Sequence, residues 1–188
     1  MSEKLSYLLA RADLTSVVRT LGWTLRPART EAPLGEVEHW GANLAGGDWC
    51  VIWSESTTVF HARPRDLATL SQQASLILCT VQETIMAFGA EGWEGGERAW
   101  SVYSLDEDEL RVEGSLPDPF VDLHRRARAD RNDPSDGVYQ QSQVPSDLAA
   151  AITGFRYANV LAEGLLGPCH PLERPRGGLL ARLFGRRT

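Results

Sequence analysis

Short apolar runs rich in β-branched residues, separated by polar and glycine-containing stretches, fill the middle of the chain. The longest of these runs, Ser75–Phe88, contains neither Gly nor Pro, which is typical of a central β-strand. After a turn-forming run at 91–97, further strands are predicted at Ala99–Tyr103 and Leu110–Gly114. Residues 75–114 are therefore predicted to form an antiparallel meander, the scaffold of the fold.

Apolar residues at spacings of three and four predict helices elsewhere in the chain. Asp13 stands where an N-cap is expected, and Pro119 directly follows Asp118 at the start of the clearest helix signal. The predicted helices span 13–21, 65–74, 119–130 and 145–153.

Two more strand patterns precede the meander, at Ser6–Ala12 and Asp48–Ser54. Thr57–His61 is predicted to pair with the second of these as a hairpin. Together the elements predict an α+β fold, with a mostly antiparallel sheet of about five to seven strands and about three to five helices.

The chain changes character at Gly167, after which prolines and glycines interrupt any regular pattern. We expect one α+β domain at 1–167 and a basic tail at 168–188. A short amphipathic segment of the tail could dock on an anionic membrane surface or in a partner's groove, or could act only as a solubilising end. Its apolar residues are Leu179, Leu180, Leu183 and Phe184, and its basic residues are Arg182, Arg186 and Arg187.

The net charge of −6 is distributed unevenly. Residues 168–188 carry five Arg and one Glu, a net charge of +4, which leaves −10 for residues 1–167. An acidic body is a poor surface for nucleic acid, because that binding depends on cationic side chains that neutralise phosphates. It suits a basic protein partner better, such as a toxin that an immunity-like protein neutralises.

The cysteines and the absence of targeting signals bear on the compartment. Cys50, Cys79 and Cys169 are an odd number and lie far apart, which indicates buried thiols in a reducing compartment and not a disulfide framework. The N-terminus lacks the basic and apolar regions of a signal peptide, and no apolar run approaches the roughly 20 residues of a membrane span. A cytoplasmic location is expected.

The sequence has no motif for a metal or a cofactor. Its four His and three Cys show no CxxC, HxxxH or HExxH spacing. The glycines at 92–96 lead into a strand, whereas a phosphate-binding loop leads into a helix, and no GxSxG elbow occurs. We therefore predict no metal and no cofactor, and we expect neither nucleotide binding nor α/β-hydrolase chemistry.

Glu83 and His61 are the first candidates for acid–base chemistry. In a regular strand Glu83 would share a face with Val81 and other apolar residues, so its carboxylate would have to be paired, hydrogen-bonded or neutral. The alternative is a bulge, an edge position, or a structural ion pair with an Arg such as Arg98 or Arg111. We favour this structural alternative, because no second carboxylate lies at a matched spacing.

Six tryptophans are many for a chain of 188 residues. Trp49 and Trp53 are four residues apart and therefore on one face of the predicted strand, where their indoles could form a binding platform. Trp93, inside the glycine-rich turn, is expected to be the most exposed. Core packing is the alternative, and we favour it for most of the six.

Several segments between residues 75 and 156 resemble a group of small bacterial proteins of unknown function. These segments are Cys79–Met86, Trp93–Gly96, Trp100–Val102, Val112–Pro117 and Val144–Arg156. The resemblance implies a bacterial, cytosolic protein. It transfers no catalytic residue, because no reaction is established for that group.

Three functional hypotheses follow. The leading one is a non-enzymatic binding or interaction protein with a basic partner. The second is an enzyme with a dispersed acid–base site around Glu83 and His61, and the third is a peripheral membrane or assembly factor that docks through its tail. The pattern indicates no particular oligomeric state.

Overall fold

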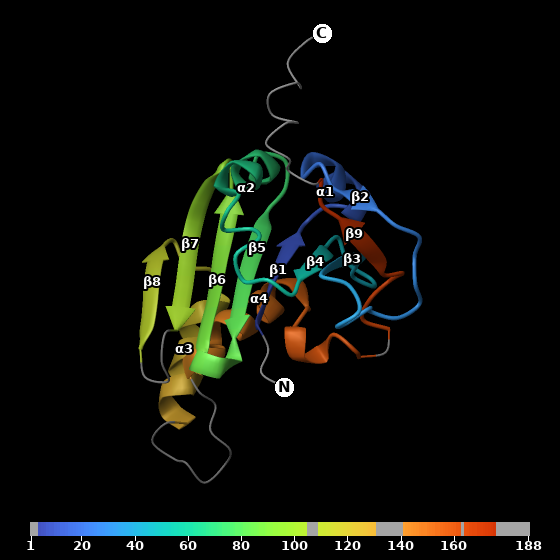
Figure 1. Cartoon of the computed structure of the whole chain (residues 1–188). Coiled ribbons are helices and arrows are strands. Elements are labelled where there is room, and N and C mark those ends of the chain that lie inside the picture. The colour runs from blue at the N-terminus through green and yellow to red at the C-terminus, as the bar shows by residue number, and fades with distance from the viewer. Residues whose placement is uncertain (1–3, 105–108, 131–140, 163, 176–188) are drawn as a thin grey trace.

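The computed structural model describes residues 4–104, 109–130, 141–162 and 164–175. These residues form a nine-stranded antiparallel sheet, in the order β2-β9-β3-β4-β1-β5-β6-β7-β8, with four α-helices (Figure 1). The predicted α+β fold with an antiparallel sheet is thereby confirmed. The strands are β1 (Lys4–Ala10), β2 (Thr24–Leu25), β3 (His39–Asn43), β4 (Cys50–Ser54), β5 (Leu76–Gln82), β6 (Ala87–Glu94), β7 (Glu97–Ser104), β8 (Leu110–Gly114) and β9 (His170–Glu173).

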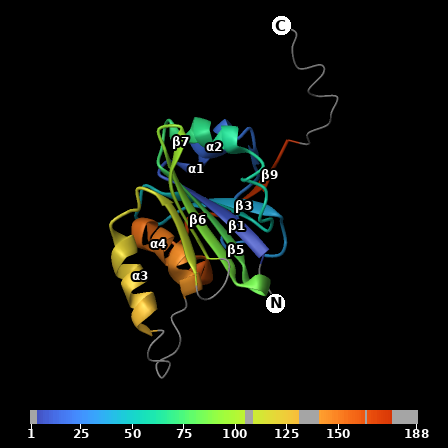
Figure 2. The same ribbon diagram turned by 90° about the vertical axis from the view of Figure 1, so that its left-hand side faces the viewer.

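All four predicted helices are present, close to their predicted bounds. They are α1 (Leu14–Thr20), α2 (Pro64–Ser71), α3 (Pro119–Asp130) and α4 (Val144–Thr153). The carboxylate of Asp13 accepts a hydrogen bond of 3.1 Å from the Ser16 backbone N–H and caps α1 as expected. Figure 2 shows α1 and α2 over one face of the sheet and α3 and α4 over the other.

The central strand β1 is buried on both faces, and this accounts for its nearly continuous apolar sequence. Tyr7 and Leu9 point into the core beneath α3 and α4, whereas Leu8 and Ala10 point into the core beneath α1 and α2. Lys4 at the start of the strand is exposed, whereas Ser6 is polar and nevertheless fully buried.

The run Ser75–Phe88 was predicted to form one strand. It instead contains β5, a turn and the start of β6, which pair as a β-hairpin. β5 ends at Gln82, a 3₁₀ turn spans Glu83–Ile85, and β6 begins at Ala87. Met86 closes the turn in the left-handed conformation, with φ of 51°. The predicted turn at 91–97 is correspondingly shorter, because β6 continues to Glu94 and only Gly95 and Gly96 reverse the chain.

Strand β4 does not form the predicted hairpin with Thr57–His61. It pairs with β1 on one side and with β3 on the other. Residues Thr57–His61 form turns that pass over the face of the sheet covered by α1 and α2, where Val59 and Phe60 enter the core. Apolar residues in this segment therefore pack from a loop and not from a strand.

The prolines after Gly167 were predicted to interrupt any regular structure, but β9 lies among them. It pairs with β3 and with β2, so part of the predicted tail belongs to the sheet. Pro171 stands within β9, and its carbonyl accepts a hydrogen bond of 2.9 Å from the Arg26 N–H. The amphipathic segment, Leu179 to Arg187, lies outside the described residues.

None of the helices in the described part of the chain has the length and apolarity that a membrane span requires.

Candidate functional site

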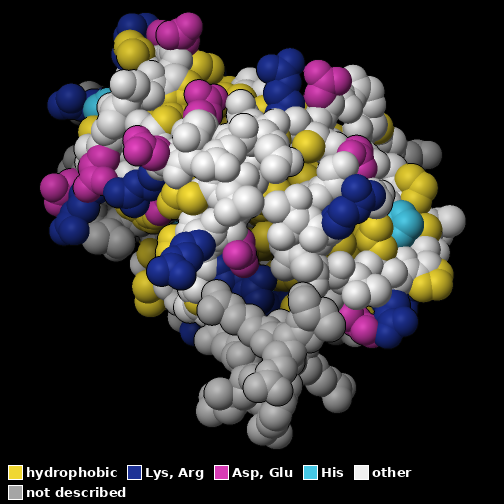
Figure 3. Space-filling model, turned by 90° about the horizontal axis from the view of Figure 1, so that it is seen from above, with side chains coloured by type: hydrophobic (Ala, Val, Ile, Leu, Met, Phe, Trp, Pro, Cys, Tyr) yellow, Lys and Arg dark blue, Asp and Glu magenta, His cyan; other side chains and the backbone are white. Residues whose placement is uncertain are grey.

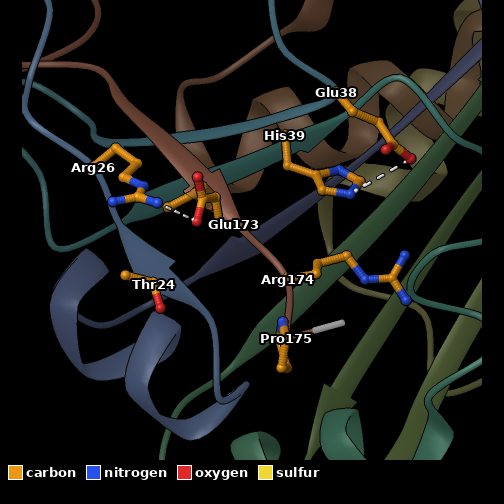
Figure 4. A pocket seen from close by; sticks show the side chains of 8 residues that line it. Thr24, Arg26, Glu38, His39, Glu173, Arg174 and Pro175 are labelled. Carbon is orange, nitrogen blue, oxygen red and sulfur yellow. Dashed lines mark hydrogen bonds and ion pairs between the residues drawn. The ribbon is translucent and has the colours of Figure 1, made fainter. Parts of the chain in front are cut away.

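A pocket of about 790 Å³ opens at the β2–β9–β3 end of the sheet (Figure 4). β2 and β9 pair antiparallel, with Thr24 opposite Glu173, and β3 begins at His39 beside them. Side chains from three distant segments of the chain are thereby brought together. The lining residues are Thr24, Arg26, Glu38, His39, Leu172, Glu173, Arg174 and Pro175.

A row of polar side chains crosses the sheet and ends at this pocket. The cross-strand partners His39, Ser54, Ser6 and Thr80 follow one another on β3, β4, β1 and β5. Ser54 Oγ lies 3.0 Å from His39 Nδ1 and accepts a hydrogen bond of 3.1 Å from the Ser56 N–H. Ser6 Oγ donates to the Ser56 carbonyl at 2.6 Å. These bonds fix the orientation of the His39 ring.

His39 is only 5% exposed, and its ring packs against the indole of Trp23 with centroids 5.1 Å apart. Burial lowers the pKa of His39, and the nearby Arg174 guanidinium lowers it further, while the Glu38 carboxylate opposes both effects. The imidazole is therefore neutral at pH 7. With Nδ1 directed at Ser54, its Nε2 lies 3.5 Å from a Glu38 carboxylate oxygen.

Two charged groups of the pocket already neutralise one another, because Arg26 Nη2 and Glu173 Oε2 form an ion pair at 2.5 Å. Arg174 differs from Arg26. Its guanidinium carbon lies 5.8 Å from the centre of the Trp23 ring, and no carboxylate among the described residues pairs with it. Glu38 has a neutral imidazole beside it. The pocket thus presents one cation and one anion that lack an oppositely charged partner in the described structure.

The side chains of Glu38, His39 and Ser54 lie next to one another in space, in the arrangement of a carboxylate–imidazole–hydroxyl relay. Such a relay activates a serine only if a substrate can reach the hydroxyl. Ser54 is 0% exposed and does not line the pocket. Its hydroxyl therefore positions His39, and the group that faces the pocket is the imidazole.

A buried charge, Glu91, lies on β6, on the face of the sheet that carries α1 and α2. The Glu91 carboxylate accepts hydrogen bonds from Trp93 Nε1 at 3.0 Å, from Arg98 Nη1 at 3.3 Å and from the Tyr103 hydroxyl. Burial and the Glu91 charge both raise the pKa of Tyr103, whose ring lies over Gly89 where any larger residue would clash. All three donors come from the β6–β7 hairpin, so this network stabilises the sheet.

The structure does not bring Glu83 and His61 together in one site. Glu83 lies in the turn after β5, where the Tyr157 hydroxyl donates to its Oε1 at 3.3 Å. His61 is exposed, and its Nε2 lies 3.0 Å from Thr80 Oγ1. Thr80 and Tyr157 belong to opposite faces of the sheet. Arg98, one of the ion-pair partners considered for Glu83, instead bonds Glu91 and Glu113.

The three candidate tryptophans do not form a platform. Trp53 is 4% exposed and stacks between Tyr7 and Trp40, with centroid distances of 6.0 and 5.5 Å. Trp49 is partly buried against the same core. Trp93, expected to be the most exposed, is a partly buried strand residue. None of the three lines the pocket.

Charges of both signs are mixed on the face of the molecule that is seen from above in Figure 3. In the view from above α1 and α2, Lys, Arg, Asp and Glu side chains lie scattered among apolar and uncharged atoms, without a large area of one sign (Figure 3). Within the described residues, no group of three or more His, Cys, Asp or Glu side chains is arranged to hold a metal ion.

The pocket residues were not recognised in the sequence. His39 and Arg174 stand in unremarkable contexts, and the nearest signal is the unusual density of Arg, Glu and Pro around residues 171–175. Comparison of the chain with models of protein families, with curated proteins and with solved structures found no match.

Proposed function

We propose that the protein is a non-enzymatic binding protein, and that the pocket binds a small ligand carrying both a carboxylate and an ammonium group, as a free amino acid does. The observation that carries this proposal is the pair Arg174 and Glu38. These opposite charges both act on His39, and neither forms an ion pair with an oppositely charged Arg, Asp or Glu among the described residues. A zwitterionic ligand would supply a carboxylate to pair with Arg174 and an ammonium group to pair with Glu38.

Each group suits one part of such a ligand. A guanidinium binds a carboxylate through two parallel hydrogen bonds, and the Trp23 ring beneath Arg174 restricts the motion of that guanidinium. The Glu38 carboxylate accepts hydrogen bonds from an ammonium group. Neutral His39 offers Nε2 as a further hydrogen-bonding atom between them.

The size and polarity of the pocket agree with a small polar ligand. Its volume of about 790 Å³ falls within the roughly 300–1,000 Å³ of common ligand sites. Leu172 and Pro175 supply the apolar part of the wall, and charged or polar residues supply most of the remainder. A large apolar ligand would leave these charges unpaired and is disfavoured for that reason.

Isothermal titration calorimetry with individual amino acids tests the proposal. We expect at least one amino acid to bind the full chain, while its N-acetyl amide, which lacks both charges, does not. Arg174→Gln and Glu38→Gln should each weaken binding by roughly tenfold or more, because each removes one charged hydrogen-bonding partner. Arg65→Gln, at an exposed residue of α2, should leave the affinity unchanged.

Two outcomes would contradict the proposal. One is the absence of binding by any amino acid, and the other is binding that survives both pocket substitutions. Retained thermal stability of the two variants separates lost recognition from lost folding. Arg174 and Glu38 are surface residues, so these variants are expected to fold normally.

The enzyme hypothesis has less support, because Glu83 and His61 lie apart and Ser54 is buried. The basic protein partner and the cytoplasmic location stay predictions. The third hypothesis depends on residues 176–188, which are outside the described structure. Affinity capture with the full chain and with a chain ending at Leu166 would test the basic partner, but the shorter chain also lacks β9 and therefore needs a folding control.

A further inference from the structure

Strand β8 forms an open edge of the sheet, at the end opposite the pocket (Figure 1). One side of β8 pairs with β7, and no strand of the described residues pairs with its other side. Arg111, Val112 and Glu113 are exposed, and Val112 exposes 45% of its surface. Such an edge presents unpaired N–H and C=O groups that another strand can join.

We propose that β8 pairs with β8 of a second copy of this chain, antiparallel and around a two-fold axis at Val112. The strand reads Leu110-Arg111-Val112-Glu113-Gly114, so its charges are self-complementary about the central valine. In this register Arg111 lies opposite Glu113 of the second copy, and Glu113 lies opposite Arg111. The two sheets become one continuous sheet across the dimer.

The register follows from the geometry of antiparallel strands. Directly opposite residues point to the same face, so a symmetric pair must be centred on a residue. A centre at Arg111 would oppose two arginines, and a centre at Glu113 would oppose two glutamates. Centres at Leu110 or Gly114 would leave most of the strand unpaired. Val112 is the centre that uses the whole strand and pairs opposite charges.

The side chains are available for these contacts. Arg111 has no ion-pair partner among the described residues. Glu113 is 68% exposed at its side chain and uses only Oε2 for its bond to Arg98, at 2.7 Å. The two valines meet on the other face of the sheet, since Val112 is opposite Val102 of the α3/α4 core. Pairing thus removes exposed apolar surface as well.

Sedimentation velocity of the full chain over a range of concentrations tests the dimer. We expect a concentration-dependent monomer–dimer equilibrium. Arg111→Glu and Glu113→Arg should each raise the dimer Kd by roughly tenfold or more, because each places like charges opposite one another twice in the symmetric pair. Arg65→Glu makes the same charge change as Arg111→Glu, but at an exposed residue of α2 outside the paired strand, and should leave the Kd unchanged.

An equimolar mixture of the Arg111→Glu and Glu113→Arg variants gives a sharper result. One copy then has two glutamates and the other has two arginines, so a heterodimer regains both ion pairs and should form where neither variant dimerises alone. A monomeric wild-type chain at its highest soluble concentration would overturn the proposal. A dimer that both variants retain, or a mixture that fails to associate although each variant keeps its thermal unfolding transition, would also overturn it.

Discussion

Substitution of Glu91 by Gln removes a buried charge while keeping the shape of the side chain. The carboxylate accepts hydrogen bonds from Trp93, Arg98 and Tyr103, and Glu91 is 5% exposed. In the amide, a nitrogen donor replaces one acceptor oxygen, so at least one of the three donors faces another donor. Hydrogen bonds to charged groups contribute about 1.5–3 kcal/mol each, and a buried unsatisfied donor costs about 1–3 kcal/mol. We expect a loss of about 2–4 kcal/mol in the free energy of unfolding.

Urea denaturation at pH 7 measures this loss as a lower midpoint with an unchanged m-value. Glu113→Gln is the matched control, because Glu113 binds the same Arg98 from an exposed position. Its loss should be below about 1 kcal/mol, as for other surface ion pairs. Tyr103→Phe, which removes one charged hydrogen bond, should lie between the two. If Glu91→Gln destabilises no more than Glu113→Gln, the buried network does not stabilise the sheet.

Three more predictions concern the core, the thiols and the pH dependence. Trp53→Ala should lower the free energy of unfolding by about 3–5 kcal/mol, because it removes the ring packed between Tyr7 of β1 and Trp40 of β3. A loss of only about 1 kcal/mol in urea denaturation would contradict this. Burial raises the pKa of Cys50 and of Cys79 to about 12. A thiol reagent at pH 8 should therefore leave both thiols unmodified in the native protein and modify both in denaturant. Fast labelling of the native protein would refute their burial. Because the pKa of His39 is lowered in the folded state, the unfolded chain binds its proton first, and stability should fall as pH drops below about 6.5. His39→Asn should flatten that slope in urea titrations between pH 5 and pH 8, about the range over which histidine titrates, and an unchanged slope would assign it to other groups.

Local signals were sufficient for the helices. Asp13 caps α1 and Pro119 begins α3, as their positions in the sequence predict. The prediction of one central strand at Ser75–Phe88 was wrong, because the chain reverses direction there without a Gly or a Pro. Glu83–Ile85 form the turn, and Met86 adopts a left-handed conformation that the sequence does not predict. Local propensity was overridden there by the pairing of β5 with β6.

The pocket could not be predicted, because its residues meet only through sheet topology. Arg26 and Glu173 are 147 residues apart in the chain, and β9 brings them together although it contains a proline. His39 belongs to a five-residue strand whose sequence, His-Trp-Gly-Ala-Asn, has little β-branched character. Its lowered pKa follows from burial, which a sequence does not reveal.

A direct test of the proposed pocket is to follow amino acid binding at the His39 ring. Nuclear magnetic resonance of the histidine side chains, with His39→Asn for assignment, follows the imidazole while an amino acid is added. We expect a saturable shift of the His39 resonances that Arg174→Gln abolishes, while the resonances of His61 and His124, which do not line the pocket, stay unchanged. Absence of a His39 shift with every amino acid, or equal shifts at His39, His61 and His124, would contradict it.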